Sequence, residues 1–361
     1  MSLLTLNVTK SDVIIGNATF RSAIGISQSF DIGDFNNDTY LDFAVGSPDV
    51  SAGDGKITIL WGPLNLASLN VDNISLTKTV FLPASGSVKE FGYVVRNAGD
   101  INGDGIQDLI STSDIGDGAA YLWYGSKFPP TVVDIETFTV NTGVKFQSIA
   151  GGGSRLGAAL LAGKDINGDG RPDIVLGAPV YKPSTLYDGI IYVVFGKNFS
   201  TSTVYLPALN GNDGYNITAP LNSNGELGFS LEALDFDNDG IAEIIGGAPY
   251  YNQVGGATYD GLVYIVKRGN SSLPTINAAS AGNWNITAPL GSNMRFGSTF
   301  NVADITGDGR SEFTIGAQYF RSSDGAIISI FGNVSFGTYI DHGSSRKEIG
   351  PNLRKSCGFD N

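Results

Sequence analysis

Five short segments of the chain concentrate carboxylate and carboxamide side chains at a fixed spacing. In DINGDGIQD, residues 100–108, oxygen-bearing side chains stand at positions one, three, five and nine, with glycines at positions four and six. Only 16% of the residues are charged, so this clustering of acids needs a specific cause. In chain order the five segments, named loops 1 to 5, are DFNNDTYLD (34–42), DINGDGIQD (100–108), DINGDGRPD (165–173), DFDNDGIAE (235–243) and DITGDGRSE (304–312).

Oxygen donors at this spacing are suited to calcium. Ca²⁺ takes about six to eight oxygen ligands at roughly 2.3–2.6 Å, whereas Mg²⁺ usually keeps several waters. Side chains at positions one, three and five turn inward, the backbone carbonyl of position seven adds an oxygen, and the acid at position nine closes the shell. The predicted ligands are Asp34, Asn36, Asp38, Tyr40, Asp42, Asp100, Asn102, Asp104, Ile106, Asp108, Asp165, Asn167, Asp169, Arg171, Asp173, Asp235, Asp237, Asp239, Ile241, Glu243, Asp304, Thr306, Asp308, Arg310 and Glu312.

Asn-Gly and Asp-Gly pairs also form hairpin turns without a metal. Turn chemistry explains the glycines, but not an acid at position nine in all five loops. Without a cation, clustered carboxylates repel one another and are driven toward protonation. We therefore expect up to five bound Ca²⁺ ions. Loop 1 should bind most weakly because Thr39 must take the positive φ that glycine takes at position six, and loop 4 most tightly because it has four carboxylates.

The net charge of −13 belongs to these loops. Their carboxylates at positions one, three, five and nine supply 16 negative charges, so the remainder of the chain is slightly positive. The sequence has no basic patch interleaved with stacking aromatics, so it gives no support for nucleic-acid binding.

Other elements recur with the loops. An apolar residue followed by glycine stands upstream of each loop, and two short apolar strands follow each loop, the first ending near GSP, STS, GAP, GAP or GAQ. The upstream pairs are Ile24-Gly25, Phe91-Gly92, Leu156-Gly157, Leu227-Gly228 and Phe296-Gly297. With 49 glycines and apolar runs rich in β-branched and aromatic residues, the chain is predicted to be all-β.

The ordered set of FG, acidic loop and GAP resembles the FG-GAP repeat of the integrin α-subunit propeller and its microbial relatives. The resemblance covers roughly residues 13–332 and implies a β-propeller whose hairpin loops bind Ca²⁺ at the positions named above. Repeats of about four strands cover their apolar faces by stacking radially. The expected propeller spans residues 1–335, with repeats near 13–78, 79–144, 145–214, 215–283 and 284–335.

The number of blades stays open, because five repeats are clear whereas integrin propellers have seven blades. The strand near residues 13–16 could complete the last blade and close a five-bladed ring, with residues 336–361 as a tail. Alternatively, residues 336–361 begin a further repeat, since Ile349-Gly350 precedes Asp360-Asn361.

The residues do not predict an enzyme. His342 is the only histidine and lies outside the repeats, so a histidine-based relay within the propeller is excluded. Cys357 is the only cysteine, so there is no disulfide framework. The loop carboxylates could act as acid and base, but bound Ca²⁺ would hold them ionised.

These features predict an extracellular, calcium-stabilised propeller for adhesion or ligand binding. No segment is apolar over the roughly 18 residues that a membrane span needs. Nine Asn-X-Ser/Thr sequons favour an extracellular glycoprotein, and they lie at Asn7, Asn17, Asn37, Asn73, Asn198, Asn216, Asn270, Asn285 and Asn333.

The expected ligand is a protein or a glycan on the face opposite the loops, where aromatic residues gather in the connections after the GAP motif. Alternatively, these aromatics pack back onto their own blades. The residues concerned are Tyr181, Tyr187, Tyr250, Tyr251, Tyr259, Tyr319 and Phe320. A second prediction for function is a structural subunit of a filament, coat or surface assembly, which would bind copies of itself.

Overall fold

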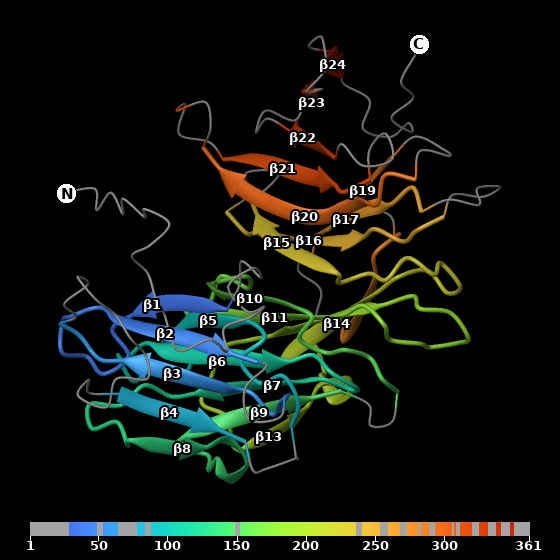
Figure 1. Cartoon of the computed structure of the whole chain (residues 1–361). Helices are drawn as coiled ribbons and strands as arrows, with labels where there is room; N and C mark the ends of the chain where they lie inside the picture. Colours follow the sequence, from blue (N-terminus) through green and yellow to red (C-terminus); the bar gives the residue numbers. More distant parts are fainter. Residues whose placement is uncertain are drawn as a thin grey trace.

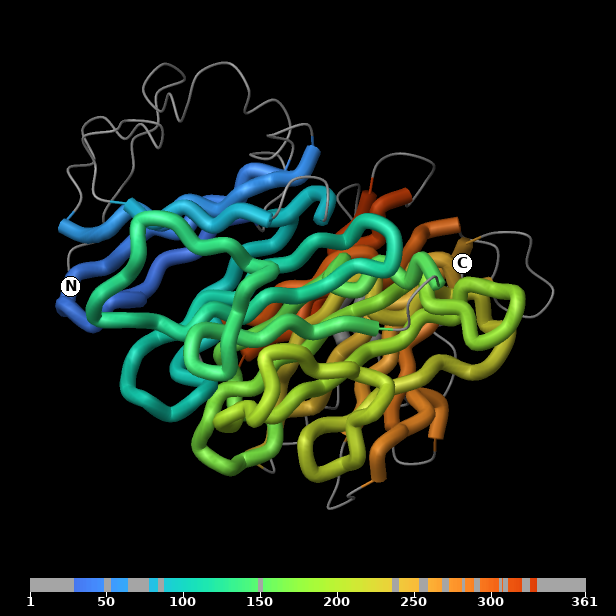
Figure 2. The backbone as a smooth tube through the Cα atoms, turned by 90° about the horizontal axis from the view of Figure 1, so that it is seen from below, coloured from blue at the N-terminus to red at the C-terminus, as the bar shows by residue number. Residues whose placement is uncertain are grey.

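The computed structural model contains almost only β-strands, as the sequence predicts. It describes residues 29–48, 53–63, 78–83, 88–148, 152–235, 240–252, 259–267, 273–280, 283–288, 293–304, 307, 311–319, 325–330, 337–340 and 347–349. Five sheets follow one another in sequence order and stack face to face (Figures 1 and 2). We number them blades 1 to 5.

Each blade has four antiparallel strands in chain order, and most blades gain a fifth strand at the outer edge. Blades 1 and 2 contain β1 (Phe30–Gly33), β2 (Asp42–Ser47), β3 (Lys56–Leu60), β4 (Lys78–Leu82), β5 (Val95–Gly99), β6 (Asp108–Ser113), β7 (Ala119–Trp123) and β9 (Gly143–Gln147). Blades 3 and 4 contain β10 (Ala159–Lys164), β11 (Asp173–Ala178), β12 (Ile190–Val194), β14 (Gly214–Thr218), β15 (Ser230–Leu234), β16 (Glu243–Ala248), β17 (Leu262–Val266) and β19 (Trp284–Thr287). Blade 5 contains β20 (Phe296–Ala303), β21 (Glu312–Ala317), β22 (Ala326–Ile330), β23 (Gly337–Ile340) and β24 (Lys347–Ile349).

The middle strands are apolar on both faces because both faces are covered. Every residue of β7, β12 and β17 is buried, and these strands are rich in the β-branched and aromatic residues that favour sheets. The innermost strands of successive blades lie side by side, in the order β1, β5, β10, β15 and β20. The apolar clusters consequently form between blades: one joins Ile110 and Leu122 of blade 2 to Leu176 and Tyr192 of blade 3.

The FG and GAP motifs meet at the junctions between blades. A Cβ atom added to Gly46 would lie 2.1 Å from the carbonyl oxygen of Gly92 in the next blade. The corresponding distance is 2.0 Å from Gly177 to Gly228 and 2.1 Å from Gly247 to Gly297. The glycines are therefore needed because two backbones touch, which leaves no room for a side chain.

The second junction departs from this rule. The strand register places Thr112, and not Ser111, where the other blades have the GAP glycine, so the match of STS to GAP was wrong by one residue. The Thr112 hydroxyl donates a hydrogen bond of 2.9 Å to the carbonyl oxygen of Gly157. A polar contact across the junction thus takes the place of the glycine contact.

A second glycine contact joins each pair of neighbouring blades. The glycine that precedes the third strand of one blade forms a parallel bridge with the apolar residue of the next FG pair. A Cβ atom there would lie 2.1–2.3 Å from backbone atoms of that residue. The bridged pairs are Gly55 with Phe91, Gly118 with Leu156, Gly189 with Leu227, and Gly261 with Phe296.

Three short strands cross from one blade to the blade before it. These strands are β8 (Val132–Asp134), β13 (Thr203–Tyr205) and β18 (Thr275–Asn277), and they pair in parallel with β4, β9 and β14. Two 3₁₀ turns follow β8 and β13, at Ile135–Thr137 and Leu206–Ala208. Each crossing strand fastens a blade to its predecessor at the outer edge, where unpaired backbone groups would otherwise be exposed.

The fifth sheet continues beyond residue 335, where the propeller was expected to end. β23 pairs with β22 as the fourth strand of blade 5. That place is therefore taken, and residues 13–16, which lie outside the described residues, are not required to complete this blade. Residues 337–340 therefore belong to blade 5, and the start of a further repeat within residues 336–361 stays a prediction.

The glycine contact between blades can be tested at Gly177. Gly177→Ala should lower the free energy of unfolding by about 1–3 kcal/mol, because the new methyl group overpacks the backbone of Gly228. Gly225→Ala is the matched control, because the nearest atom to its Cβ is 3.2 Å away and belongs to a side chain. Thermal and urea melts of both variants give the comparison, and equal midpoints would contradict a backbone contact at this junction.

Candidate functional site

Positions one, three and five converge in the three loops that are fully described. In loop 2 the backbone N–H of Asp104 donates to Asp100 Oδ1 and to Asn102 Oδ1, at 2.9 Å each. The Asn102 amide in turn donates to Asp104 Oδ2 at 2.9 Å. Loops 1 and 3 repeat the pattern at Asp38 and Asp169. Each loop thus gathers side-chain oxygens around its own backbone.

The acid at position nine is buried in all five loops. In loops 1 to 3 its two oxygens accept backbone N–H groups from different segments. Asp108 accepts from Ile101 at 2.9 Å and from Gly125, after the third strand, at 3.0 Å. Asp42 and Asp173 repeat both contacts. In loops 1 to 3 the structure therefore shows a role for this acid other than the predicted metal binding, because the acid links the loop to a glycine just after the third strand.

Burial is costly for these acids when they are charged. Desolvation raises the pKa of Asp108 to about 7 and the pKa values of Asp42 and Asp173 to about 6, although two backbone N–H groups act in the opposite direction. The two other carboxylates of each loop add to the increase by charge repulsion. A cation near these groups would remove that penalty.

Position six takes positive φ, as predicted. Gly105, Gly170 and Gly240 have φ of 88°, and Thr39 has φ of 75° in loop 1. A β-branched residue is strained in this region. Loop 1 therefore stays the predicted weakest site, on the ground of this strain.

Loops 4 and 5 are described only in part. Asp235 accepts the backbone N–H of Gly240 at 2.9 Å, and Asp304 accepts that of Gly307 at 2.6 Å. Ile241, Glu243 and Glu312 are also described, and the two glutamates are buried. The remaining predicted ligands lie outside the described residues, namely Asp237, Asp239, Thr306, Asp308 and Arg310.

The donor set fits a hard cation. Each fully described loop offers three carboxylates and one carboxamide, and no nitrogen or sulfur ligand, which is the chemistry that Ca²⁺ prefers. The described residues contain no group of three or more Asp, Glu, His or Cys side chains gathered into a preformed metal cluster. In the geometry described, the loop oxygens instead bind backbone N–H groups. The carbonyls of Tyr40, Ile106 and Arg171 stay predicted ligands.

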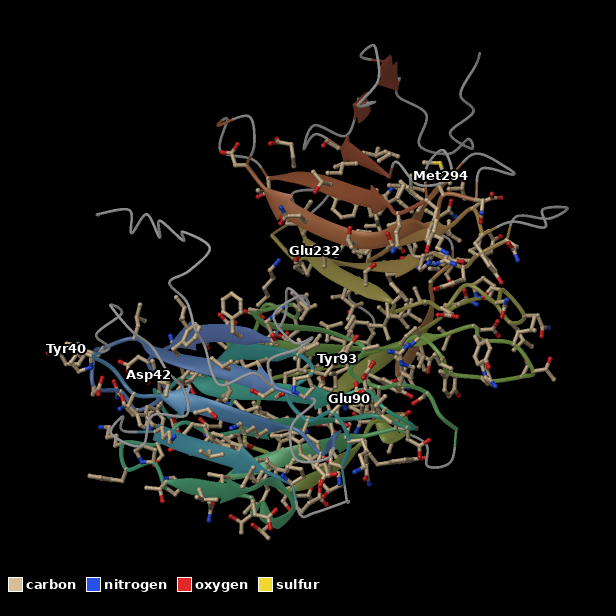
Figure 3. All side chains as sticks on the ribbon, in the orientation of Figure 1. Tyr40, Asp42, Glu90, Tyr93, Glu232 and Met294 are labelled. Atoms are coloured by element: carbon tan, nitrogen blue, oxygen red, sulfur yellow. The ribbon has the colours of Figure 1, made fainter. Side chains whose placement is uncertain are left out.

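The tyrosines occupy the connections at the opposite ends of the strands from the loops. Figure 3 shows Tyr40 and Asp42 at one end of blade 1, with Glu90 and Tyr93 toward the other end of the stack. Tyr181 and Tyr251 pack against the interblade cores, as the alternative interpretation expected. The exposed tyrosines on this face are Tyr187, Tyr259 and Tyr319.

Arg295 joins the tyrosines of blades 4 and 5 into a cluster. Its guanidinium carbon lies 4.3 Å from the ring centroid of Tyr319, 4.8 Å from that of Tyr250 and 5.8 Å from that of Tyr259. Tyr250 and Tyr259 also contact each other edge to face at 5.2 Å. We call these four residues the Arg-Tyr cluster. It combines flat apolar rings with a fixed positive charge, which suits a polar ligand with an apolar face.

Glu226 lies on the same face and adds a titratable group. Burial raises its pKa to about 6, against the opposite effect of Arg155 and Arg295. Like Arg295, Glu226 directly precedes the apolar residue of an FG pair and has positive φ, at 58°. The residue before each of the four described FG pairs is charged and has positive φ, and these residues are Glu90, Arg155, Glu226 and Arg295.

A set of acids between the blades was missed from the sequence. Each precedes a glycine that bridges to the next FG pair, and Asp117, Asp188 and Asp260 accept backbone N–H groups of the segment just before that pair. Asp188 accepts the backbone N–H groups of Asn222 and Asn224 at 2.9 Å, and Asp117 accepts that of Gly153 at 2.7 Å. The recurring Asp-Gly pairs at 54, 117, 188, 260 and 324 are the signal that could have revealed these contacts.

Two further observations concern location. Among the described residues, no helix is long and apolar enough to cross a membrane. The sequon residue Asn216 lies in β14 and is buried, so it is a poor glycan acceptor in the folded chain, whereas Asn37, Asn198 and Asn285 are exposed.

Comparison with known proteins agrees with the repeat pattern. The family described as FG-GAP repeat matches residues 28–60, 156–194 and 227–266. Human phosphatidylinositol-glycan-specific phospholipase D is 30% identical over 173 residues, which cover 46% of this chain and 19% of that protein. Integrin alpha pat-2 of Caenorhabditis elegans is 27% identical over 258 residues, covering 64% and 18%.

Integrin alpha-4 of Xenopus laevis is 31% identical over 180 residues, which cover 49% of this chain and 15% of that protein. The chain thus spans a fifth or less of the length of these relatives. The similarity to an enzyme and to integrin chains alike is confined to a part of each protein. Three segments of this chain therefore match the FG-GAP repeat, and its five successive sheets with their glycine contacts are consistent with a β-propeller of such repeats.

Proposed function

We propose that the chain is an extracellular FG-GAP propeller whose loops bind calcium for stability and whose opposite face binds a protein or glycan ligand. The Arg-Tyr cluster carries this proposal, because it gathers exposed aromatic rings and a cation on a face that the calcium loops do not use. The similarity to integrin alpha chains and the sequons support it.

In this proposal the chain is not itself a catalyst. Its relatives named as phospholipase D share only 19% of their length with it in the human protein, so their activity does not transfer through this match. His342 and Cys357 lie outside the described residues. The described face presents tyrosine, arginine and glutamate side chains that are suited to contact.

Calcium would act by neutralising the loops. With the ion bound, the carboxylates at positions one, five and nine become ligands, and the buried charge at position nine gains a counterion. The hairpin that joins the first and second strands would then be fastened to the end of the third strand. The predicted effect is on stability.

Asp165→Asn tests the calcium proposal in loop 3. Asp165 Oδ1 accepts the N–H of Gly168 and Oδ2 that of Gly170, at 2.7 Å each, and the amide oxygen can replace only one of these acceptors. Circular dichroism without metal therefore checks first that the variant folds. Removing one negative ligand should lower the calcium affinity of this loop by about tenfold or more. Calorimetric titration of the full chain with CaCl₂ measures the loss. A titration unchanged from the parent chain would contradict metal binding in loop 3.

The raised pKa values predict how stability depends on pH. Without metal, the folded chain binds more protons than the unfolded chain between about pH 4 and 7, because Asp42, Asp108 and Asp173 have raised pKa values only when folded. Their contribution to the free energy of unfolding therefore falls as pH rises through this window. Calcium competes with these protons, so it should raise the melting temperature more at about pH 7.5 than at about pH 5. Melts in CaCl₂ and in EDTA at both values test this, and an equal calcium effect would contradict it.

The Arg-Tyr cluster can be tested by cell binding. Labelled full chain is applied to cells before and after enzymatic removal of surface glycans or surface proteins. Tyr259→Ala and Tyr319→Ala should each weaken binding by about tenfold, as expected for aromatic contacts. Tyr40→Ala is the control, because Tyr40 is also an exposed tyrosine but lies at the loop face. Equal binding by all variants would contradict a ligand site at the cluster.

A further inference from the structure

Blade 5 carries the same two docking glycines as the other blades. Gly316 stands four residues after position nine of its loop, where blades 1, 3 and 4 have Gly46, Gly177 and Gly247. Gly325 directly precedes the third strand, as the four bridging glycines do in blades 1 to 4. The surface that accepts an FG pair is therefore present a fifth time.

These two glycines lack the contact that their counterparts make among the described residues. A Cβ atom at Gly261 would lie 2.3 Å from the backbone of Phe296, in the next blade. At Gly325 the nearest atoms are 3.7 Å away, and at Gly316 the nearest is Thr299 Oγ1 at 2.2 Å, all within blade 5. No described FG pair is seated on this blade.

The exposure of Ile327 supports the same conclusion. This side chain is 56% exposed, and it lies two residues after the docking glycine. The residues at this position in blades 1 to 4 are between 0% and 1% exposed, and they are Ile57, Ala120, Ile191 and Val263. This position is therefore buried in blades 1 to 4 and exposed in blade 5.

A groove lies at Gly316, Gly325 and Ile327 of blade 5. It has a volume of about 490 Å³, and its lining includes Gly316, Ala317, Gln318, Gly325, Ala326 and Ile327. We call it the blade-5 groove. Its lining is mostly apolar or glycine, which is the chemistry that accepts an apolar residue followed by glycine at the other junctions.

Chain spacing identifies the occupant. In blades 1 to 4 the apolar residue of the docked FG pair lies nine residues after the end of the fourth strand: β4 ends at Leu82 before Phe91, and β19 ends at Thr287 before Phe296. The fourth strand of blade 5, β23, ends at Ile340. Nine residues further stands Ile349, followed by Gly350.

We infer that the blade-5 groove is the docking site of this chain's own Ile349-Gly350. The described strand β24, which ends at Ile349, pairs antiparallel with β23. That outer edge is the place where blades 1 to 3 receive the parallel strands β8, β13 and β18 from the following blade. In the structure Ile349 therefore lies in β24, at the outer edge of blade 5. The corresponding apolar residues of the four described FG pairs instead contact the bridging glycine of the preceding blade.

Thiol labelling of the full chain tests this inference. Ile327→Cys is made with Cys357→Ser, and its rate of reaction with N-ethylmaleimide is compared with that of Phe128→Cys, a control residue that is 91% exposed. A seated Ile349-Gly350 covers residue 327, so its thiol should react at least about tenfold more slowly than the control. Adding Ile349→Ser should restore fast labelling, whereas the conservative Ile349→Val should keep it slow. Circular dichroism checks that each variant is folded.

Three results would overturn the inference. Labelling of Ile327→Cys as fast as the control would mean that the groove is open. Slow labelling that Ile24→Ser relieves, and Ile349→Ser does not, would assign the groove to the first repeat and thus to closure of the ring. Slow labelling that depends on protein concentration, or that neither serine substitution relieves, would mean that a second copy or another segment covers it.

Discussion

The fold depends on one constraint, which is that a four-stranded sheet with two apolar faces cannot stand alone in water. Stacking of the blades covers both apolar faces of each sheet. The blades can approach closely because their backbones touch at paired glycines, where a side chain would not fit. The contact repeats at three of the four described junctions, with Thr112 in place of a glycine at the second, so the residues that make it also repeat as the FG and GAP motifs. The parallel crossing strands add a second link at the outer edge.

Stacking also decides where chemistry is possible. It fixes one set of strand ends as acidic loops and the opposite set as tyrosine-bearing connections. At the loop end, a buried acid at position nine accepts two backbone N–H groups, yet its pKa is raised, as that of Asp108 is to about 7. Hydrogen bonds alone therefore leave part of the desolvation cost uncompensated, and a cation in the loop would supply the remainder.

Most of the fold was predictable from the sequence because its signals are local and repeated. The strands, the five loops and the positive φ at position six follow from short patterns such as DINGDG. The crossing strand at Val132–Asp134 and the contact of Asp188 with Asn222 were not predicted, because both join segments of different blades. Nor did the sequence distinguish a ligand role from a hydrogen-bonding role for Asp108, since both need an acid at one position. The sequence also did not distinguish packed from exposed tyrosines. Tyr181 packs on an apolar core and Tyr259 is exposed, a difference that depends on the neighbouring blades.

The most direct measurement of the central claim is a crystal structure of the chain grown in calcium-containing buffer. The account predicts ions in up to five loops, with loop 4 the tightest site and loop 1 the weakest, bound by oxygens of positions one, three, five, seven and nine at about 2.3–2.6 Å. Loops that keep only their internal hydrogen bonds, such as that of the Asp104 N–H to Asp100, with no ion among them, would contradict it.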